Sequence, residues 1–372
     1  MSKLCIVVSA RASYSRIRSV LLNLKQQKSI EFRLVLVTSA TLSKYGDLKN
    51  YIRSDGLSVD YEFESQLDPQ SNTAMVKSTA LTMLSLSDYF LNEKITSVLL
   101  VADRHETLAI SAASAYMGIQ TFHLQGGERT GNIDDKVRFA NSFLSDYHFV
   151  ATESARTRLL SMEFRSDTVF NVGCPSIDFA AEASRTSAKG IKFRGVGADP
   201  STLLQEPFIV VLQHAETTSE IPPRAQIRET IRAVEESELG AFWIWPNSDR
   251  GGDELVSEIR AAREGGKLKR VHFEKSFSPE AFLSLLNDSS CIVGNSSVSV
   301  REGSFLGIPA VNIGTRQKDR AMVQNSENVT FSSNDIKYAI VKQVNHGRFE
   351  SNKIYGTGIS GETIAQLLSK LL

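Results

Sequence analysis

A short segment of small polar residues follows an apolar run at residues 291–294, where a buried strand is expected to end and a helix at 299–306 to begin. Its four residues are Gly294, Asn295, Ser296 and Ser297. Free backbone N–H groups and the positive end of a helix dipole suit a phosphate, and the serine hydroxyls add donors without bulk. Glu302, further along this helix, could reach a ribose diol. A simple helix cap at one of the serines is the alternative, although a cap and an anion site can share atoms.

Arginines follow two other predicted strands. Arg316 and Arg320 come after a strand at 309–313 that leads into a glycine, and they could hold a base, a phosphate or a sugar. Arg11 lies in the loop after the first predicted strand, where the glycines of a GxGxxG fingerprint are missing. This absence argues against a dinucleotide cofactor and for a looser nucleotide contact. A solvated basic turn and an ordinary surface arginine are the respective alternatives.

Carboxylates gather after the third and fourth predicted strands of the first half. They are Asp103, Glu128, Asp134 and Asp135, and the neighbouring arginines are Arg104, Arg129 and Arg138. Parallel strands bring their carboxyl ends to one edge of a sheet, so we expect these side chains to meet there. Converging carboxylates modulated by arginines are typical of general acid–base catalysis. The simpler possibility is that Asp134 caps a helix and that Asp103 pairs with an arginine.

Two polar residues follow strands of the second half. His214 comes directly after the strand predicted at 208–213, from which it could donate to a phosphate or serve as an acid. Asn247 follows the strand predicted at 241–246 and is a further candidate for nucleotide contact. A lone histidine is more often structural, so this interpretation depends on its position at a strand end.

These residues can act together only if the chain gathers its strand ends, and the order of elements predicts that it does. Strand-like runs alternate with helical patterns such as those at 14–27, 73–92 and 218–238. The predicted strands are 4–9, 32–38, 97–102, 121–124 and 148–151 in the first half, and 208–213, 241–246, 271–273, 291–294 and 309–313 in the second. Two such sets predict an α/β chain with two Rossmann-like, doubly wound parallel-sheet domains.

The predicted division of the chain follows from where periodicity fades. We expect a first domain at 1–180, a linker at 181–204 and a second domain at 205–358. The leucine-rich end, 359–372, reads as an amphipathic helix that could pack back on the first domain.

Bulk properties exclude several classes of protein. The chain has 372 residues, with 42 Lys plus Arg against 42 Asp plus Glu, so no net charge favours nucleic acid or an anionic membrane. Its three cysteines, Cys5, Cys174 and Cys291, form no CxxC pair or Cys/His cluster, so neither structural zinc nor a disulfide framework is predicted. No signal-like or membrane-spanning run is seen, which makes the cytoplasm the expected compartment.

Together these motifs resemble the UDP-N-acetylglucosamine 2-epimerases, specifically the hydrolysing branch that opens sialic and legionaminic acid synthesis. ADRHE (102–106) resembles that branch's GDRFE, and QGGERTGNIDD (125–135) resembles GGExxxGxIDD. Further motifs follow in the family's order: FNVGCPSID, QHAETT, WPNSDRGG, VGNSSVSVREG, GIPAVNIGTRQKDR and KIYGTG. The resemblance extends over essentially the whole chain.

The resemblance implies a GT-B fold with an interdomain cleft, the nucleotide mainly on the second domain and the sugar facing the first. It implies anti elimination of UDP with loss of the C2 proton, followed by addition of water to give the free 2-epimer, of the N-acetylmannosamine type. Asp103 and Asp134 match catalytic carboxylates, and Arg11 sits at the equivalent first-loop arginine. Nucleotide contacts match at His214, Ser296, Ser297, Glu302 and Arg316. No metal or redox cofactor is implied, and a homodimer or homotetramer is expected.

Three positions depart from the family's pattern. Ser13 replaces the carboxylate usual in the first loop, and Ala102 replaces the glycine of GDR, which looks like a small change. Gln125 stands where several members have a third catalytic glutamate, and a glutamine cannot take up a proton. That step would then fall to Glu128 or Asp134, or be unnecessary for this substrate.

Two other functions remain compatible with the sequence. A GT-B glycosyltransferase would share the diphosphate site, but it would have no evident use for the carboxylate cluster. A nucleotide-sugar-binding homologue without activity could have arisen through the changes at Ser13 and Gln125.

Overall fold

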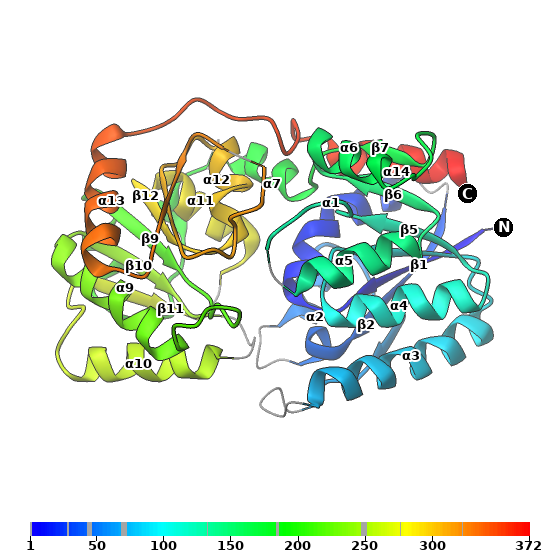
Figure 1. Cartoon of the computed structure of the whole chain (residues 1–372), viewed down its shortest axis with the longest axis horizontal. Helices are drawn as coiled ribbons and strands as arrows, with labels where there is room; N and C mark the ends of the chain where they lie inside the picture. Colours follow the sequence, from blue (N-terminus) through cyan, green and yellow to red (C-terminus); the bar gives the residue numbers. More distant parts are fainter. Residues whose placement is uncertain are drawn as a thin grey trace. The chain divides into compact units, whose positions relative to one another are not determined.

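The computed structural model describes residues 2–27, 30–42, 47–67, 73–131, 133–183, 186–246, 251–275, 277–321 and 323–372. The chain divides into two compact units. Unit 1 comprises Met1–Arg129, Ile133–Asp178 and Ile354–Leu372, and unit 2 comprises Thr130–Asn132 and Phe179–Lys353. The chain therefore leaves unit 1 after Asp178 and returns to it at Ile354 (Figure 1).

Unit 1 is built on a sheet whose described part has seven strands, in the order β3-β2-β1-β4-β5-β6-β7. All neighbouring strands run parallel. The strands are β1 (Lys3–Val8), β2 (Glu31–Val37), β3 (Tyr61–Phe63), β4 (Ser97–Val101), β5 (Gln120–Leu124), β6 (Tyr147–Val150) and β7 (Val169–Asn171). The helices are α1 (Arg11–Gln27), η1 (Thr38–Thr41), α2 (Leu48–Ser54), α3 (Ala74–Glu93), α4 (His105–Tyr116), α5 (Asp134–Phe143), α6 (Glu153–Ser161) and α14 (Ser360–Leu371). Helix α7 (Ser176–Ala183) spans the boundary between the units.

Both faces of this sheet are buried, which explains why its strands are continuous apolar runs. In β1, Ile6 lies in one hydrophobic cluster with residues of α1 and α14, whereas Cys5 and Val7 lie in another with residues of α3 and α4. Alternate residues of a strand point to opposite faces, so α1 and α14 cover one face and α3 and α4 the other (Figure 1).

The C-terminal helix α14 belongs to unit 1. It packs on α1 and contributes Ile364, Ala365 and Leu368 to the cluster that contains Ile6. The carboxylate of Asp178 accepts the backbone N–H groups of Ser360 at 2.9 Å and Gly361 at 2.7 Å, which satisfies free donors in the first turn of α14.

Unit 2 repeats the plan with a described seven-stranded sheet in the order β14-β13-β12-β9-β10-β11-β8. Strand β8 is antiparallel to β11 and the other pairs are parallel. The strands are β8 (Val196–Gly197), β9 (Phe208–Leu212), β10 (Gly240–Ile244), β11 (Val271–Glu274), β12 (Cys291–Gly294), β13 (Ala310–Ile313) and β14 (Ser326–Val329). The helices are η3 (Ala188–Gly190), α8 (Pro200–Leu203), α9 (Pro223–Ser237), α10 (Gly252–Glu264), α11 (Pro279–Asp288), η4 (Ser297–Ser299), α12 (Glu302–Phe305) and α13 (Ser333–His346).

The two predicted parallel-sheet α/β domains are confirmed, but some predicted elements differ. Each sheet has two more strands than expected, β3 and β7 in unit 1 and β8 and β14 in unit 2, and these are only two to four residues long. Such short strands show little periodicity. The helix predicted at 218–238 begins later, at Pro223, because Pro222 and Pro223 fix the first turn.

The helix predicted at 299–306 is confirmed only at Glu302–Phe305. The structure has a three-residue 3-10 turn, η4, followed by the four-residue α12. Such short elements give little macrodipole, so any anion site there depends on individual N–H and hydroxyl groups instead.

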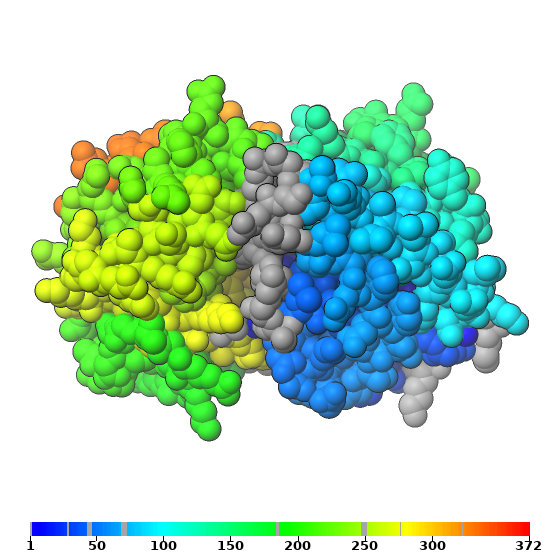
Figure 2. All heavy atoms as spheres, turned by 90° about the horizontal axis from the view of Figure 1, so that it is seen from below, coloured from blue at the N-terminus to red at the C-terminus, as the bar shows by residue number. Residues whose placement is uncertain are grey.

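Helix α3 presents an apolar outer surface. Val76 is 71% exposed, Leu84 65% and Leu91 70%, and this helix forms part of the face of unit 1 seen in Figure 2. Among the described residues, no helix is long and apolar enough to cross a membrane.

Candidate functional site

The strand ends of unit 1 lie at one edge of its sheet. Three of the residues directly after these strands have positive φ without being glycine: Thr38 after β2 at +50°, Ala102 after β4 at +65° and Gln125 after β5 at +64°. The left-handed region is costly for residues with a Cβ atom, and residues strained in this way cluster at active sites as well as at helix ends such as Lys94. The backbone of this edge is therefore strained at three strand ends, a common feature of active sites.

Asp103 forms an ion pair with Arg138, a buried arginine of α5 that is 1% exposed. The same guanidinium binds Asp135 at 2.6 Å and the backbone carbonyl of Glu128 at 2.8 Å. One cation thus joins three of the segments that the sequence predicted would meet. The pairing of Asp103 with an arginine, which the sequence left open, is confirmed, and the partner is Arg138.

The neighbouring Arg104 is held by an ion pair with Glu106. The Glu106 carboxylate is fully buried and lies 3.2 Å from the Arg104 Nε atom, and it also accepts the hydroxyl of Thr38 at 3.2 Å. Burial raises the pKa of Glu106, but Arg104 and His105 lower it by more, so the net pKa lies below the usual range. Glu106 is therefore an ionised anchor for Arg104. The sequence contained it in ADRHE but gave no reason to select it.

The residue before Asp103, Ala102, contacts a buried neutral histidine. The Nε2 atom of His123 hydrogen-bonds the Ala102 carbonyl at 2.8 Å, and its Nδ1 lies 3.1 Å from the Ser142 hydroxyl. Burial lowers the pKa of His123 to about 4, so the ring is neutral near pH 7. A Cβ on Gly126 would lie 2.9 Å from both His123 Nδ1 and Ser142 Oγ, which explains the glycine after Gln125.

The remaining candidates of unit 1 occupy different settings. Gln125 is 1% exposed, and its Nε2 donates to the Sγ atom of Cys174 at 2.9 Å. Glu128 is 5% exposed and lies on the loop bound by Arg138. Asp134 is the first residue of α5 and is half-buried.

Arg11 is the first residue of α1, and this helix has no acidic residue in its first turn. Burial lowers the pKa of the Arg11 guanidinium, an effect that Tyr51 partly opposes. A cation at the positive end of a helix dipole is unfavourable, and a bound anion would relieve that cost.

In unit 2, three strand-end loops are joined by neutral hydrogen bonds. The Asn295 side chain, after β12, accepts the His214 N–H at 2.8 Å and donates to the His214 carbonyl at 2.9 Å. The Asn295 carbonyl in turn accepts Gln317 Nε2 at 2.9 Å, from the loop after β13. Asn295 is fully buried with both amide atoms used, so its side chain supports the loop of His214.

The segment predicted to grip a phosphate is compact. Gly294 has φ +139°, and a Cβ there would lie 2.0 Å from the Leu212 carbonyl oxygen, so only glycine fits. Ser296 caps η4 by accepting the Val298 N–H at 3.4 Å, a long bond, and Ser296 and Ser297 are both half-buried. The alternative of a helix cap is thus realised in part, at a 3-10 turn.

Glu302, Arg316 and Arg320 complete this edge. The Oε2 atom of Glu302 is buried without a hydrogen-bond partner in the described part of the chain. Arg316 is half-buried, and Arg320, which is 9% exposed, donates from Nε to the Gln317 side chain. Asn247 lies outside the described residues.

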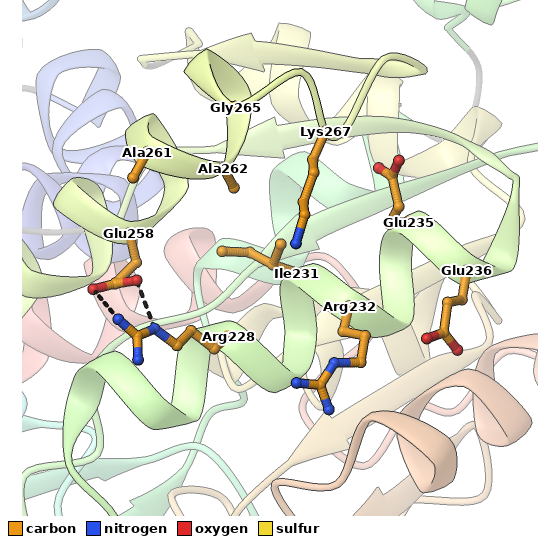
Figure 3. Close-up of a pocket in the computed structure, with 10 residues that line it drawn as sticks. All are labelled: Arg228, Ile231, Arg232, Glu235, Glu236, Glu258, Ala261, Ala262, Gly265 and Lys267. Atoms are coloured by element: carbon orange, nitrogen blue, oxygen red, sulfur yellow. Dashed lines mark hydrogen bonds and ion pairs between the residues drawn. The ribbon is translucent and has the colours of Figure 1, made fainter.

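A hollow on unit 2 lies apart from these residues. It is lined by side chains of α9 and α10 and of the turn after α10, and Arg228 forms a two-point ion pair with Glu258 across it (Figure 3). None of the residues that line it was predicted to be functional. Its charged groups are mostly paired or solvated.

Comparison with known proteins decides the family. A family model described as UDP-N-acetylglucosamine 2-epimerase matches residues 22–369. The chain belongs to this family. The resemblance inferred from the motifs is therefore confirmed.

Individual relatives of the epimerase family agree. A UDP-N,N'-diacetylbacillosamine 2-epimerase (hydrolyzing) from Legionella pneumophila is 30% identical over 99% of this chain and 96% of its own length. A UDP-N-acetylglucosamine 2-epimerase from Neisseria meningitidis serogroup B is 26% identical over 99% of this chain and 95% of its own. The crystal structure of UDP-GlcNAc 2-epimerase from Neisseria meningitidis, bound to UDP-GlcNAc, superposes with a TM-score of 0.80 at 19% identity, covering 99% of this chain and 100% of the other. That likeness confirms a GT-B-like fold.

Proposed function

We propose that this epimerase-family chain is a hydrolysing nucleotide-sugar 2-epimerase acting on a UDP-linked 2-acetamido sugar. The observation on which the proposal depends is the pair of carboxylates, Asp103 and Asp135, bound by buried Arg138 at the strand-end edge of unit 1. A transferase would not need this arrangement, and nothing in the family match favours one.

In the proposed reaction a carboxylate of unit 1 removes the C2 proton while the C1–O bond to the diphosphate breaks. The electron pair of the C–H bond forms the C1=C2 double bond, and UDP leaves with the C1–O pair. Water then adds at C1 and a proton returns to C2 on the opposite face, giving the free 2-epimer. One water is consumed for each UDP released.

Asp103 is the carboxylate we assign to the proton transfer, with Asp134 and Glu128 for the later step. Arg138 fixes the direction of the Asp103 carboxylate, as proton transfer in a defined geometry requires. Gln125 cannot titrate, and its amide is bound to Cys174, so we assign it a hydrogen-bonding role.

The residues of unit 2 are assigned to the nucleotide. Ser296, Ser297, His214 and Arg316 would stabilise the negative charge that develops on the departing diphosphate, which is where catalysis of an elimination gains most. The Oε2 atom of Glu302, which has no hydrogen-bond partner among the described residues, is a suitable acceptor for a ribose hydroxyl. Arg11 of unit 1 is a further candidate for the diphosphate, because an anion relieves its position at the start of α1.

The sugar is proposed from the relatives. The Legionella protein is a UDP-N,N'-diacetylbacillosamine 2-epimerase and the Neisseria protein a UDP-N-acetylglucosamine 2-epimerase, so a 2,4-diacetamido or a 2-acetamido sugar is expected here. Because Gln125 stands where several family members have a catalytic glutamate, both sugars should be tested as substrates.

The decisive experiment is incubation in heavy water with UDP-N-acetylglucosamine, UDP-N,N'-diacetylbacillosamine and the GDP-linked counterparts. We expect one free sugar with deuterium at C2 and an equal amount of nucleoside diphosphate. Release of sugar with protium at C2, or epimerisation with the nucleotide still attached, would overturn the proposal. Tight UDP binding without turnover of any donor would instead identify a binding protein.

We also propose that the chain self-associates. The exposed apolar residues of α3 support this, because α3 has few charged residues to oppose a second copy. Analytical ultracentrifugation of the wild type and of Leu84→Lys tests it, and a monomeric wild type would contradict it.

A further inference from the structure

Glu216 is a buried carboxylate on the loop after β9; it lies within the QHAETT motif, but no role was predicted for it. It is 5% exposed. Both of its oxygens bind a single residue, Thr315: Oε2 accepts the backbone N–H at 2.8 Å and Oε1 accepts the hydroxyl at 2.5 Å. Thr315 immediately precedes Arg316.

The main chain of Glu216 is equally fixed. Its N–H donates to Gln226 Oε1 at 3.0 Å, and Gln226 Nε2 donates back to the Glu216 carbonyl at 3.0 Å. Gln226 lies on α9 and is fully buried. The carboxylate therefore starts from a rigid position, so its hydrogen bonds constrain Thr315 more than they constrain Glu216.

The turn that Glu216 binds has little freedom. Gly314 has φ +80°, and a Cβ there would lie 2.4 Å from Glu216 Oε2 and 2.7 Å from the Phe331 ring. The Lys318 N–H donates to the Thr315 carbonyl at 2.9 Å, which closes the turn around Arg316. On the far side, Gln317 binds the Asn295 carbonyl. Arg316 is thus the residue between two tied positions.

We propose that Glu216 is a positioning residue that presents Arg316 to the diphosphate through its two hydrogen bonds to Thr315. The inference rests on the proposed nucleotide-binding role of Arg316. A hydrogen bond to a carboxylate is about twice as strong as a neutral one, which suits a residue whose function is to fix a loop before ligand arrives. Arginine side chains are long, so a fixed backbone is needed to limit the volume that the guanidinium samples.

The test is a double-mutant cycle on UDP affinity, measured by calorimetry. Glu216→Ala should weaken UDP binding about 10-fold and Glu216→Gln, which keeps one acceptor oxygen, about threefold. Thr315→Val should resemble Glu216→Gln, and Thr315→Ser, which keeps the hydroxyl, should bind as the wild type does. Glu220→Ala, an exposed glutamate on the same loop, is the matched control and should change nothing.

Arg316 separates positioning from a merely structural role. In an Arg316→Ala background, the substitution Glu216→Ala should have almost no further effect on UDP affinity, because the residue it positions is gone. Full additivity of the two substitutions, or unchanged UDP affinity in both Glu216 variants, would overturn the inference. If Glu216→Ala does not fold, Glu216→Gln supplies the cycle.

Failure of the proposed function gives a different result. A wild type that binds neither UDP nor GDP refutes the nucleotide site. The fixing of the turn by Glu216 is then tested by amide hydrogen exchange across residues 313–318, which should be faster in Glu216→Gln than in Glu220→Ala. Equal exchange in those two variants would refute the positioning role itself.

Discussion

The strand-end edges of the two units are stabilised in different ways. In unit 1 the side chains at the edge are joined by ion pairs, with Arg138 bound to Asp103 and Asp135 and with Arg104 bound to Glu106. In unit 2 the corresponding loops are joined by amides and backbone groups, above all by Asn295. One edge pairs charges of opposite sign, whereas the other is joined by hydrogen bonds of the Asn295 amide and the Glu216 carboxylate with backbone and hydroxyl groups.

The backbones differ in the same sense. At the ends of β2, β4 and β5 in unit 1, the residues with positive φ carry side chains (Thr38, Ala102 and Gln125), whereas at the ends of β12 and β13 in unit 2 they are glycines (Gly294 and Gly314). Strain with paired charges is typical of catalytic positions, and a relaxed frame of hydrogen bonds is typical of a binding site formed before its ligand arrives. The comparison therefore supports the proposal that the chemistry belongs to unit 1 and nucleotide binding to unit 2.

The largest expected effect tests that assignment. Asp103→Asn removes the charge paired with Arg138, and we expect turnover to fall by about 10²–10⁴-fold, the usual contribution of a general acid or base. UDP affinity should stay within about twofold, because most nucleotide contacts are assigned to unit 2 and Asp103 is assigned to none. Steady-state kinetics and calorimetry measure the two quantities.

The control is Asp88→Asn, an exposed aspartate on α3, which should alter neither quantity. Near-normal turnover in Asp103→Asn would remove the catalytic assignment. A large loss of UDP affinity would instead show that the two functions are not divided between the edges.

The second prediction concerns acid. Burial lowers the pKa of His123 to about 4, and burial together with the charge of His123 lowers the pKa of His148 to about 3. An unfolded histidine has a pKa of about 6.5, so unfolding takes up protons below that pH. The unfolding free energy of unit 1 should be highest above pH 6.5 and fall as the pH drops toward 4, by about 1.4 kcal/mol per pH unit for each histidine.

Spectroscopy can assign this loss to a unit. Both tryptophans, Trp243 and Trp245, lie in unit 2, so their fluorescence reports unit 2 while far-UV circular dichroism reports both. Between pH 7 and pH 5 the urea midpoint seen by circular dichroism should fall by more than the midpoint seen by fluorescence. His148→Phe, which keeps the edge contact with Phe164, should reduce the acid sensitivity, and the same pH profile in this variant would contradict the explanation.

The sequence predicted more of the fold than of the site. Long apolar runs such as 97–102 and 208–213 correspond to β4 and β9. A strand that is buried on both faces is apolar throughout, so a continuous apolar run is enough to predict it. The short strands β3 and β8 were missed because three or two residues contain no pattern. The helix at 299–306 was predicted too long, because a cap followed by apolar residues does not distinguish the start of a helix from a 3-10 turn.

At the site, residue types were easier to predict than partners. The places of Asp103, Glu128 and Arg138 in the sequence correctly predicted that they lie together, since the position of a loop follows from the topology. The sequence could not show that the Asn295 side chain would bind the His214 backbone, nor that Glu216 would bind Thr315. Those contacts depend on the register between β9, β12 and β13, which no local pattern records.

The third prediction tests the hydrogen bonds by which Asn295 joins the strand-end loops of unit 2. Asn295→Ala deletes both hydrogen bonds to the His214 backbone, and the unfolding free energy seen by tryptophan fluorescence should fall by about 1–3 kcal/mol. UDP affinity should fall as well, because His214 is no longer fixed. Asn345→Ala, on the exposed face of α13, is the control and should stay within about 0.5 kcal/mol. A stable Asn295→Ala protein with normal UDP affinity would mean that the frame is not formed as described.

The smallest expected effect concerns strain in unit 1. Ala102, 3% exposed, has φ +65°, and the family's GDR motif has glycine at this position, so a change that looked small in the sequence places a Cβ in the left-handed region. Glycine avoids a cost of about 1–2 kcal/mol but loses more backbone entropy, so Ala102→Gly should raise the unfolding free energy by about 0.5–1 kcal/mol.

The same substitution on α3 is expected to have the opposite sign. Ala80→Gly, at an exposed position in the helix interior, should lower the unfolding free energy by about 1 kcal/mol. Urea unfolding followed by circular dichroism gives both values, and a destabilised Ala102→Gly would show that this position is not strained. If Ala102→Gly is more stable but slower in turnover, the strain at the end of β4 contributes to orienting Asp103, and the two edges differ in backbone energy as well as in charge.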